Sequence, residues 1–143
     1  MVSSFFILTI LLTNIILLTI YCSYEAQKVR PFKSNLENVD GNLHIYVQNA
    51  SFYPSANLEV YIDDNKLISK NYPTVGEHSY KKSIFKVEPG IYDFKFYSPD
   101  LNLEKSEEIN IDDTPWILVI LHELGDSQPS FLILKSAKPF VFL

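Results

Sequence analysis

The sequence after residue 42 predicts an all-β domain, a single antiparallel β-sandwich, and three observations support this fold class. Apolar and polar residues alternate with a period of two in several short runs, as in strands with one buried face. Turn-forming residues separate these runs at intervals of roughly 8–12 residues. An apolar pattern with the helical period of 3.6 is absent outside the N-terminus, and a small barrel is the alternative architecture.

The first predicted strands cover residues 43–49 and 58–62, where LHIYVQN and NLEVYID alternate. The side chains expected to point inward are Leu43, Ile45, Val47, Leu58, Val60 and Ile62. The stretch DDNK, residues 63–66, predicts a hairpin turn because Asp and Asn tolerate the left-handed backbone conformation. Residues 66–72 would then form the returning strand.

The middle of the domain predicts three further strands. SIFKV, residues 83–87, is followed by the turn pair Pro89-Gly90. GIYDFKFYS then alternates up to the turn that begins at residue 98. Its expected inward side chains are Tyr92, Phe94 and Phe96. Residues 107–111 alternate again and end at the turn-forming run DDTP.

The last third of the chain is the most apolar part of the predicted domain. WILVILHEL, residues 116–124, is apolar at six successive positions, which predicts a central strand covered on both faces. FLILK (131–135) and the terminal PFVFL (139–143) would be the last of seven to nine strands. The sandwich would be immunoglobulin-like only in the broad sense, because the two cysteines that bracket a tryptophan in true immunoglobulin domains are absent.

A local resemblance supports the same architecture. LEVYIDDNKLI followed by FKVEPGIYDFKFYS, within residues 58–98, resembles the core of PEGA-type and related small surface β-sandwich modules. Those modules pair a strand that ends in an Asp-containing hairpin with a later strand introduced by Pro-Gly. Their namesake tetrapeptide is absent here, and Glu88-Pro89-Gly90 approximates it. The resemblance implies a surface or envelope scaffold without catalytic residues.

Residues 1–22 form a hydrophobic signal or anchor segment, because all 12 Lys and Arg and all 17 Asp and Glu follow Cys22. About 20 apolar residues span a bilayer, which makes an uncleaved membrane anchor the first expectation. The segment also resembles a lipobox, with Leu18 upstream of Cys22, and this implies acylation of Cys22. Tyr21 departs from that pattern, which normally has Gly, Ala or Ser before the cysteine. A cleaved signal peptide is the third alternative.

Residues 23–41 are polar and predict a linker, and residues 42–143 predict the β-sandwich domain. We expect a membrane-anchored protein with an extracytoplasmic domain, periplasmic or at the cell surface, and secretion is the alternative. The positive-inside rule, applied alone to Lys28, Arg30 and Lys33, would instead hold the domain in the cytoplasm. The formal charge of −5 argues against nucleic acid as a partner, and a single cysteine excludes an internal disulfide.

The sequence contains no catalytic motif, and it predicts neither an enzyme nor a cofactor or metal site. His44, His78 and His122 lie far apart in the sequence, unlike the close histidine pairs of zinc sites. The pairs Asp63-Asp64 and Asp112-Asp113 precede turns, and turn formation explains them.

The best candidate for binding is aromatic. Tyr46, Tyr61 and Tyr97 fall on the polar faces of predicted strands, and they would form an exposed ligand patch if those strands are neighbours. Such a patch would suit a protein or a glycan partner. We therefore expect a membrane-tethered, non-catalytic structural or protein-interaction module, with a carbohydrate- or ligand-binding module as the alternative. Asn49-Ala50-Ser51 also matches the glycosylation sequon.

Overall fold

A computed structural model describes residues 40–74, 80–125 and 127–142. The expectations for residues 1–22, for the linker up to residue 39, for Cys22 and for His78 lie outside these residues. Within the described ranges, the structure contains no helix long and apolar enough to cross a membrane. The first strand begins at Leu43, one residue after the predicted start of the domain.

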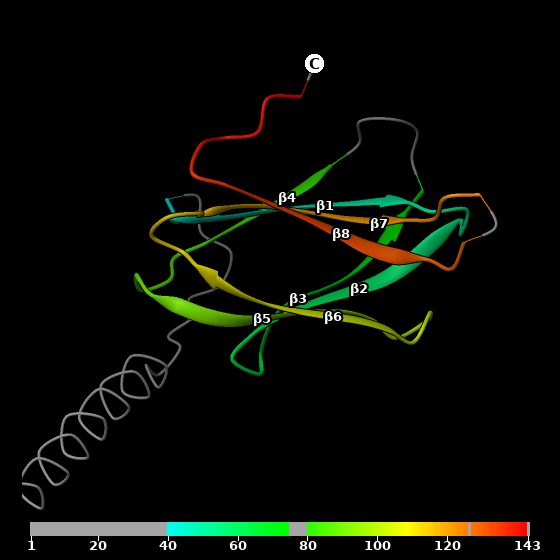
Figure 1. Cartoon of the computed structure of the whole chain (residues 1–143), viewed down its shortest axis with the longest axis horizontal. Helices are drawn as coiled ribbons and strands as arrows, with labels where there is room; N and C mark the ends of the chain where they lie inside the picture. The colour runs from blue at the N-terminus through cyan, green and yellow to red at the C-terminus, as the bar shows by residue number, and fades with distance from the viewer. Residues whose placement is uncertain (1–39, 75–79, 126, 143) are drawn as a thin grey trace, which may run out of the picture. The chain divides into compact units, whose positions relative to one another are not determined.

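The described residues form two four-stranded sheets packed as layers, as the sequence predicts (Figure 1). One sheet has the strand order β4-β1-β7-β8 and the other has the order β3-β2-β5-β6. The strands are β1 (Leu43–Ala50), β2 (Ser55–Ile62), β3 (Asn65–Pro73), β4 (Lys81–Phe85), β5 (Ile91–Ser98), β6 (Leu103–Asn110), β7 (Trp116–His122) and β8 (Ser130–Ser136).

The core lies between the two sheets and consists of the inward rows that the alternation predicts. Each of these side chains is at most 3% exposed: Leu43, Ile45, Val47, Leu58, Val60, Ile62, Tyr92, Phe94 and Phe96. Phe94 and Phe96 stack with ring centroids 6.1 Å apart. Burial of these aliphatic and aromatic side chains, at roughly 25 cal/mol for each Å² of apolar surface, is the main term that stabilises the domain.

Three pairs of consecutive strands form hairpins, and the first has the turn that the sequence predicts. β2 and β3 are joined by Asp63 and Asp64, whose φ angles are 44° and 64°. Two left-handed residues in a two-residue loop match the right-handed twist of the flanking strands. The Asp63 carboxylate also accepts a hydrogen bond of 2.9 Å from the backbone N–H of Asp93, which ties the turn to β5.

The expectation of an entirely antiparallel sandwich is wrong at one strand pair. β1 and β7 run parallel, with Ile45 opposite Ile117 and Val47 opposite Val119. Two parallel neighbours need a long connection, and here the whole β3-β2-β5-β6 sheet and β4 lie between them in the sequence. Turn chemistry predicts the β2–β3 hairpin, whereas this pairing is set by residues far apart in the chain.

Several element boundaries, and one predicted strand, also differ from the prediction. β6 begins at Leu103 instead of residue 107, and β4 covers residues 81–85 instead of 83–87. The described part of PFVFL, residues 139–142, is not a strand, although its alternation resembles one. Pro139 cannot donate a ladder hydrogen bond, and the rings of Phe140 and Phe142 pack against Tyr46 on the outside of the first sheet.

Candidate functional site

The two sheets differ in the chemistry of the faces that point away from the core. On the sheet β3-β2-β5-β6 this outer face is charged. Its ionisable side chains on the strands are Glu59, Lys66, Asp93, Lys95, Glu104 and Glu108. We call it the charged face.

The outer face of the sheet β4-β1-β7-β8 is instead apolar and aromatic, and we call it the apolar face. The strand registers show which side chains point outward on this sheet. On the edge strand β4 and its neighbour β1 they are Lys82, Ile84, His44, Tyr46, Gln48 and Ala50. On β7 and β8 they are Trp116, Leu118, Ile120, His122, Ser130, Leu132, Leu134 and Ser136. These four strands are fully described, and their outward positions include no acidic residue and only one lysine. An outer sheet face of this composition is unusual, since such faces are ordinarily polar.

An aromatic cluster occupies one end of the apolar face. The rings of His44 and Trp116 stack at 3.7 Å with an interplanar angle of 6°, and Tyr46 lies 6.2 Å from Trp116. The ammonium group of Lys82 lies 5.3 Å from the centroid of the Trp116 ring and 5.5 Å from that of Tyr46, within cation–π distance. The cluster is therefore ordered by stacking across β1 and β7.

The C-terminal residues cover part of this cluster. The ring of Phe142 lies 5.4 Å from Tyr46 and stacks on Tyr80 at 4.0 Å. Phe140 meets Tyr46 edge-on at 6.1 Å. The tail thus lies against the apolar face, which explains why PFVFL is apolar without being a strand.

His44 is in an environment that favours its neutral form. Burial lowers the pKa of its imidazole below the ordinary value of 6.5, and the positive charge of Lys82 lowers it further. The Nδ1 atom is buried and has no hydrogen-bond partner within the described part of the chain. Protonation of His44 would therefore place a second positive charge beside Lys82 in a poorly hydrated position.

The β8 edge of the apolar face is exposed among the described residues. Leu132 and Leu134 of the edge strand β8 are 41% and 42% exposed. By register they lie beside Ile120 and Leu118 of β7. Leu118 is only 4% exposed, although it points away from the core, whereas Ile120 is half-buried. The exposed apolar side chains of this face are therefore Leu132 and Leu134 at the sheet edge, with Ile120 partly exposed beside them.

The three tyrosines predicted to form one patch are divided between the two sheets. Tyr46 lies on the apolar face, whereas Tyr61 and Tyr97 lie on β2 and β5, which pair on the charged face. A common patch requires that the three strands are neighbours. β2 and β5 are neighbours, so Tyr61 and Tyr97 meet this condition, but β1 neighbours neither strand and Tyr46 does not meet it. A ligand for Tyr61 and Tyr97 stays a prediction.

Tyr61 is part of a polar network on the charged face. Its hydroxyl donates a hydrogen bond to the Glu59 carboxylate, which also receives Lys66 at 2.7 Å. The ammonium groups of Lys95 and Lys66 lie 4.4 Å and 5.4 Å from the centroid of the Tyr61 ring. The hydrogen bonds from Lys66 and Tyr61 lower the pKa of Glu59, and the bond to Glu59 raises that of Tyr61. These contacts engage Tyr61 within the sheet.

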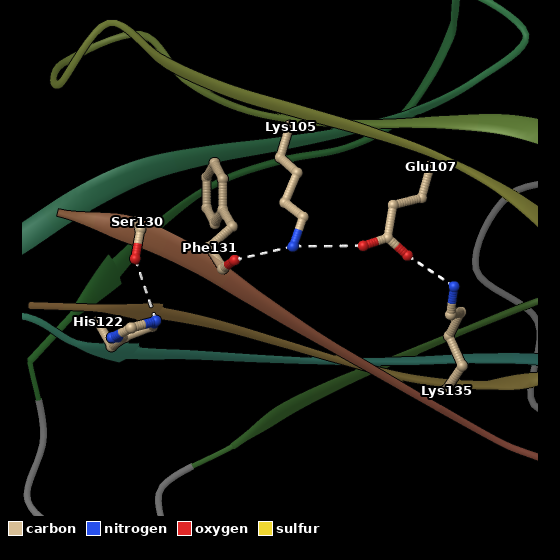
Figure 2. Close-up of polar contacts among 6 residues, drawn as sticks. All are labelled: Lys105, Glu107, His122, Ser130, Phe131 and Lys135. Carbon is tan, nitrogen blue, oxygen red and sulfur yellow. Dashed lines mark hydrogen bonds and ion pairs between the residues drawn. The ribbon is translucent and has the colours of Figure 1, made fainter.

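A second polar network joins the two sheets where the edge strands β6 and β8 approach each other (Figure 2). Lys135 of β8 binds Glu107 of β6 at 2.7 Å, and Lys105 lies 3.3 Å from the other Glu107 oxygen. Lys105 also donates to the backbone carbonyl of Phe131 at 3.3 Å, as Figure 2 shows. Burial raises the pKa of Glu107, but hydrogen bonds and charges from Lys135 and Lys105 outweigh this and lower it. Inward-pointing charges of this kind protect edge strands from pairing with other chains.

The sequon at Asn49 is used structurally in the folded domain. The Asn49 side chain is buried, and its Nδ2 donates to the carbonyls of Tyr72 at 3.0 Å and Tyr53 at 3.3 Å. Its Oδ1 accepts from the backbone N–H of Ser51 at 3.1 Å and from the Ser51 hydroxyl at 2.6 Å. An attached sugar would displace these bonds. Asn49 and Ser51 are therefore explained by their hydrogen bonds in the loop that connects β1 to the other sheet.

The described histidines are not brought together. His44 and His122 lie on adjacent strands, but His122 pairs with Ala50, six residues along β1 from His44 and therefore about 20 Å away. His122 instead contacts the Ser130 hydroxyl at 3.1 Å (Figure 2). Among the residues that the structure describes, no group of three or more His, Cys, Asp or Glu could hold a metal ion.

No model of a known protein family matches the chain, and no curated protein sequence matches it.

Sequence reasoning missed the apolar face as a candidate surface, although its signal was present. WILVIL and FLIL are apolar at every position, which means that both faces of β7 and β8 are apolar. The first run predicts a strand covered on both sides, and in β7 Leu118 is 4% exposed while Trp116 and Ile120 are half-buried. On the neighbouring β8, Leu132 and Leu134 are substantially exposed.

Proposed function

We propose that this protein is a membrane-tethered, non-catalytic β-sandwich that acts as a structural or protein-interaction module. The observation that carries the interaction part of the proposal is the exposed portion of the apolar face. Monomeric soluble proteins rarely expose large contiguous apolar surfaces, and such surfaces commonly mark sites of association. The tether is supported by the uncharged segment of residues 1–22.

The surroundings of this face support binding in preference to chemistry. The aromatic cluster is a packed array of rings with a single lysine, and it presents no nucleophile beside a general base. On the charged face, Tyr61 is engaged by Glu59, Lys66 and Lys95. The carbohydrate-binding alternative, which needs free tyrosine rings, therefore has less support than association through the apolar face.

The tether is tested by the intact mass of the protein extracted from its native membrane fraction after a carbonate wash. We expect the chain to resist the wash, because about 20 apolar residues partition stably into a bilayer. A full-length mass would identify an uncleaved anchor, and a mass that begins at Cys22 with added acyl chains would identify a lipoprotein. Both results support the tether.

A chain that is recovered in the soluble fraction, with a mass that begins after the hydrophobic segment and carries no lipid, would contradict the tether. In that case the protein would be secreted or periplasmic. The interaction proposed for the apolar face would then have to be examined on the processed chain.

A further inference from the structure

We propose that the C-terminal segment of residues 139–142 is a displaceable cover of the aromatic cluster, and that the uncovered cluster binds an apolar peptide segment of the same kind. The bound segment would carry two phenylalanines separated by one residue, as Phe140 and Phe142 are. The inference deepens the proposed function and rests on it, since it names a binding site of the interaction module and the class of its partner.

The chain itself shows which chemistry the cluster accepts. Phe142 stacks on Tyr80 at 4.0 Å and lies 5.4 Å from Tyr46, and Phe140 meets Tyr46 edge-on at 6.1 Å. Val141 lies between these two phenylalanines in the sequence and is 80% exposed. This alternation is that of an extended segment, whose successive side chains point to opposite sides. Two phenylalanines on one side of an extended segment therefore define the ligand.

The segment is held by its side chains and not by its backbone. Among the described residues, no backbone hydrogen bond joins residues 139–142 to the sheet, in contrast to the ladder that joins β8 to β7. The neighbouring bond from the Lys138 N–H to the Ser136 hydroxyl, at 3.0 Å, is local. Chain ends with few hydrogen bonds and exposed side chains open at a lower free energy than paired strands. The segment can therefore leave while β8 stays in place.

The surface beneath the segment is formed by the sheet and does not depend on the segment. Tyr46 and Trp116 come from the paired strands β1 and β7, and the Trp116 ring stacks on His44 at 3.7 Å. Lys82 of β4 lies 5.5 Å and 5.3 Å from the centroids of the Tyr46 and Trp116 rings. A site that is already ordered loses little side-chain entropy on binding, which favours affinity.

The composition of the cluster favours a peptide segment over a sugar. Binding sites for polar small molecules combine apolar rings with precisely placed polar groups that fix the orientation of the ligand. The outward positions of the four strands carry no carboxylate, the Gln48 side chain is buried, and the Lys82 ammonium lies over two rings. Phenylalanine needs only ring contacts, and these are the contacts that Phe140 and Phe142 make.

The tail and a second segment would compete for the same rings. A segment on a short connection has an effective concentration in about the millimolar range. A free peptide that binds the open cluster with a dissociation constant of about 0.1 mM would then bind the covered domain about tenfold more weakly. The cover therefore favours partners that are present at high local concentration, such as proteins in the same membrane.

The test measures binding of a fluorescein-labelled peptide of residues 136–143, SAKPFVFL, to the chain in lipid nanodiscs. Fluorescence anisotropy is the readout, and empty nanodiscs are the blank. The full chain is compared with a shortened form that ends at Lys138. We expect the shortened form to bind the peptide about tenfold more tightly than the full chain. A peptide with alanine in place of both phenylalanines should bind the shortened form at least tenfold more weakly.

Single substitutions show whether the described ring contacts are the cause. Phe142→Ala in the full chain removes the contacts with Tyr46 and Tyr80, and it should shift the affinity for the peptide toward that of the shortened form. Val141→Ala is the matched control and should leave the affinity unchanged, because Val141 is exposed. In the shortened form, Tyr46→Ala should reduce peptide binding by about tenfold, whereas Tyr97→Ala on the charged face should not.

Three results would overturn the proposal. One is a shortened form that unfolds cooperatively on heating but binds the peptide no more tightly than the full chain. Another is a shortened form that does not fold, because the segment would then be a fixed part of the domain. The third is equal binding of the peptide and its alanine version, because the cluster would then not recognise the phenylalanines.

Assembly into nanodiscs separates this proposal from the proposed function. A chain that enters nanodiscs but binds no peptide keeps its tether without this site, and its exposed edge at Leu132 and Leu134 stays open to association. A chain that binds the peptide but is recovered outside the nanodiscs keeps the site without the tether.

Discussion

At the scale of single residues, the environment of each side chain matters more than its identity. Of the two described histidines, His44 stacks on Trp116 beside Lys82, whereas His122 contacts a serine hydroxyl. Asn49 belongs to a sequon in the sequence and to a buried hydrogen-bond network in the fold. The predicted turn residues Asp63 and Asp64 are the clearest case in which residue type alone predicts local geometry, because few side chains tolerate positive φ.

His44 makes the stability of the domain dependent on pH. Its pKa lies below 6.5 in the folded state, mainly because of burial and secondly because of Lys82. The unfolded chain therefore binds more protons as the pH falls below about 6.5, and the free energy of unfolding decreases in that direction. We expect a decrease between pH 7 and pH 5 that is smaller in His44→Phe, measured by denaturant unfolding of the full-length protein in detergent. An equal decrease in the variant would contradict this assignment.

At the scale of elements, hairpins follow from local sequence and sheet order does not. β2-β3, β5-β6 and β7-β8 are pairs of consecutive antiparallel strands, and the turn residues Asp63 and Asp64 predict the first of these hairpins. The parallel pair of β1 with β7 has no local signal, because its two strands are separated by most of the domain. The same holds for the tail, whose contacts with Tyr46 and Tyr80 decide that it is not a strand.

The β2–β3 turn gives an element-scale prediction. Asp64 has a φ of 64°, and its replacement by Gly would remove the steric cost of the left-handed conformation. We expect Asp64→Gly to increase the free energy of unfolding by about 0.5–1 kcal/mol. Asp63→Gly is the matched control, and it should bring less benefit because it also removes the hydrogen bond from the Asp93 N–H. Equal gains in both variants, measured by urea unfolding, would contradict this account.

The inner strand β7 gives a second prediction at this scale. Leu118 and Ile120 point to the same outer face, but Leu118 is 4% exposed and Ile120 is half-buried. We expect Leu118→Asp to lower the free energy of unfolding by about 3 kcal/mol or more, and Ile120→Asp by about half as much, because an unpaired charge costs more where water is excluded. Thermal unfolding of both variants measures the difference. A more stable Leu118→Asp protein would show that the outer cover of β7 is misplaced.

At the scale of the whole domain, the two sheets have different outer surfaces. One is a charged face with ion pairs around Tyr61, and the other is an apolar face that the tail covers only in part. The ion pairs of Glu107 with Lys105 and Lys135 connect the edge strands β6 and β8 of the two sheets. The association that we propose for this module would therefore use the apolar side, where Leu132 and Leu134 are exposed.

The all-β class, the inward rows of the core and the Asp63-Asp64 turn follow from local sequence. Period-two burial and left-handed turn residues are properties of neighbouring positions, so a single chain segment contains them. Three features depend on the assembled fold: Tyr46 lies apart from Tyr61 and Tyr97, β1 pairs with β7, and Leu132 and Leu134 are exposed. Which strands become neighbours depends on packing between distant segments, and a surface shared by several strands exists only after that packing is complete.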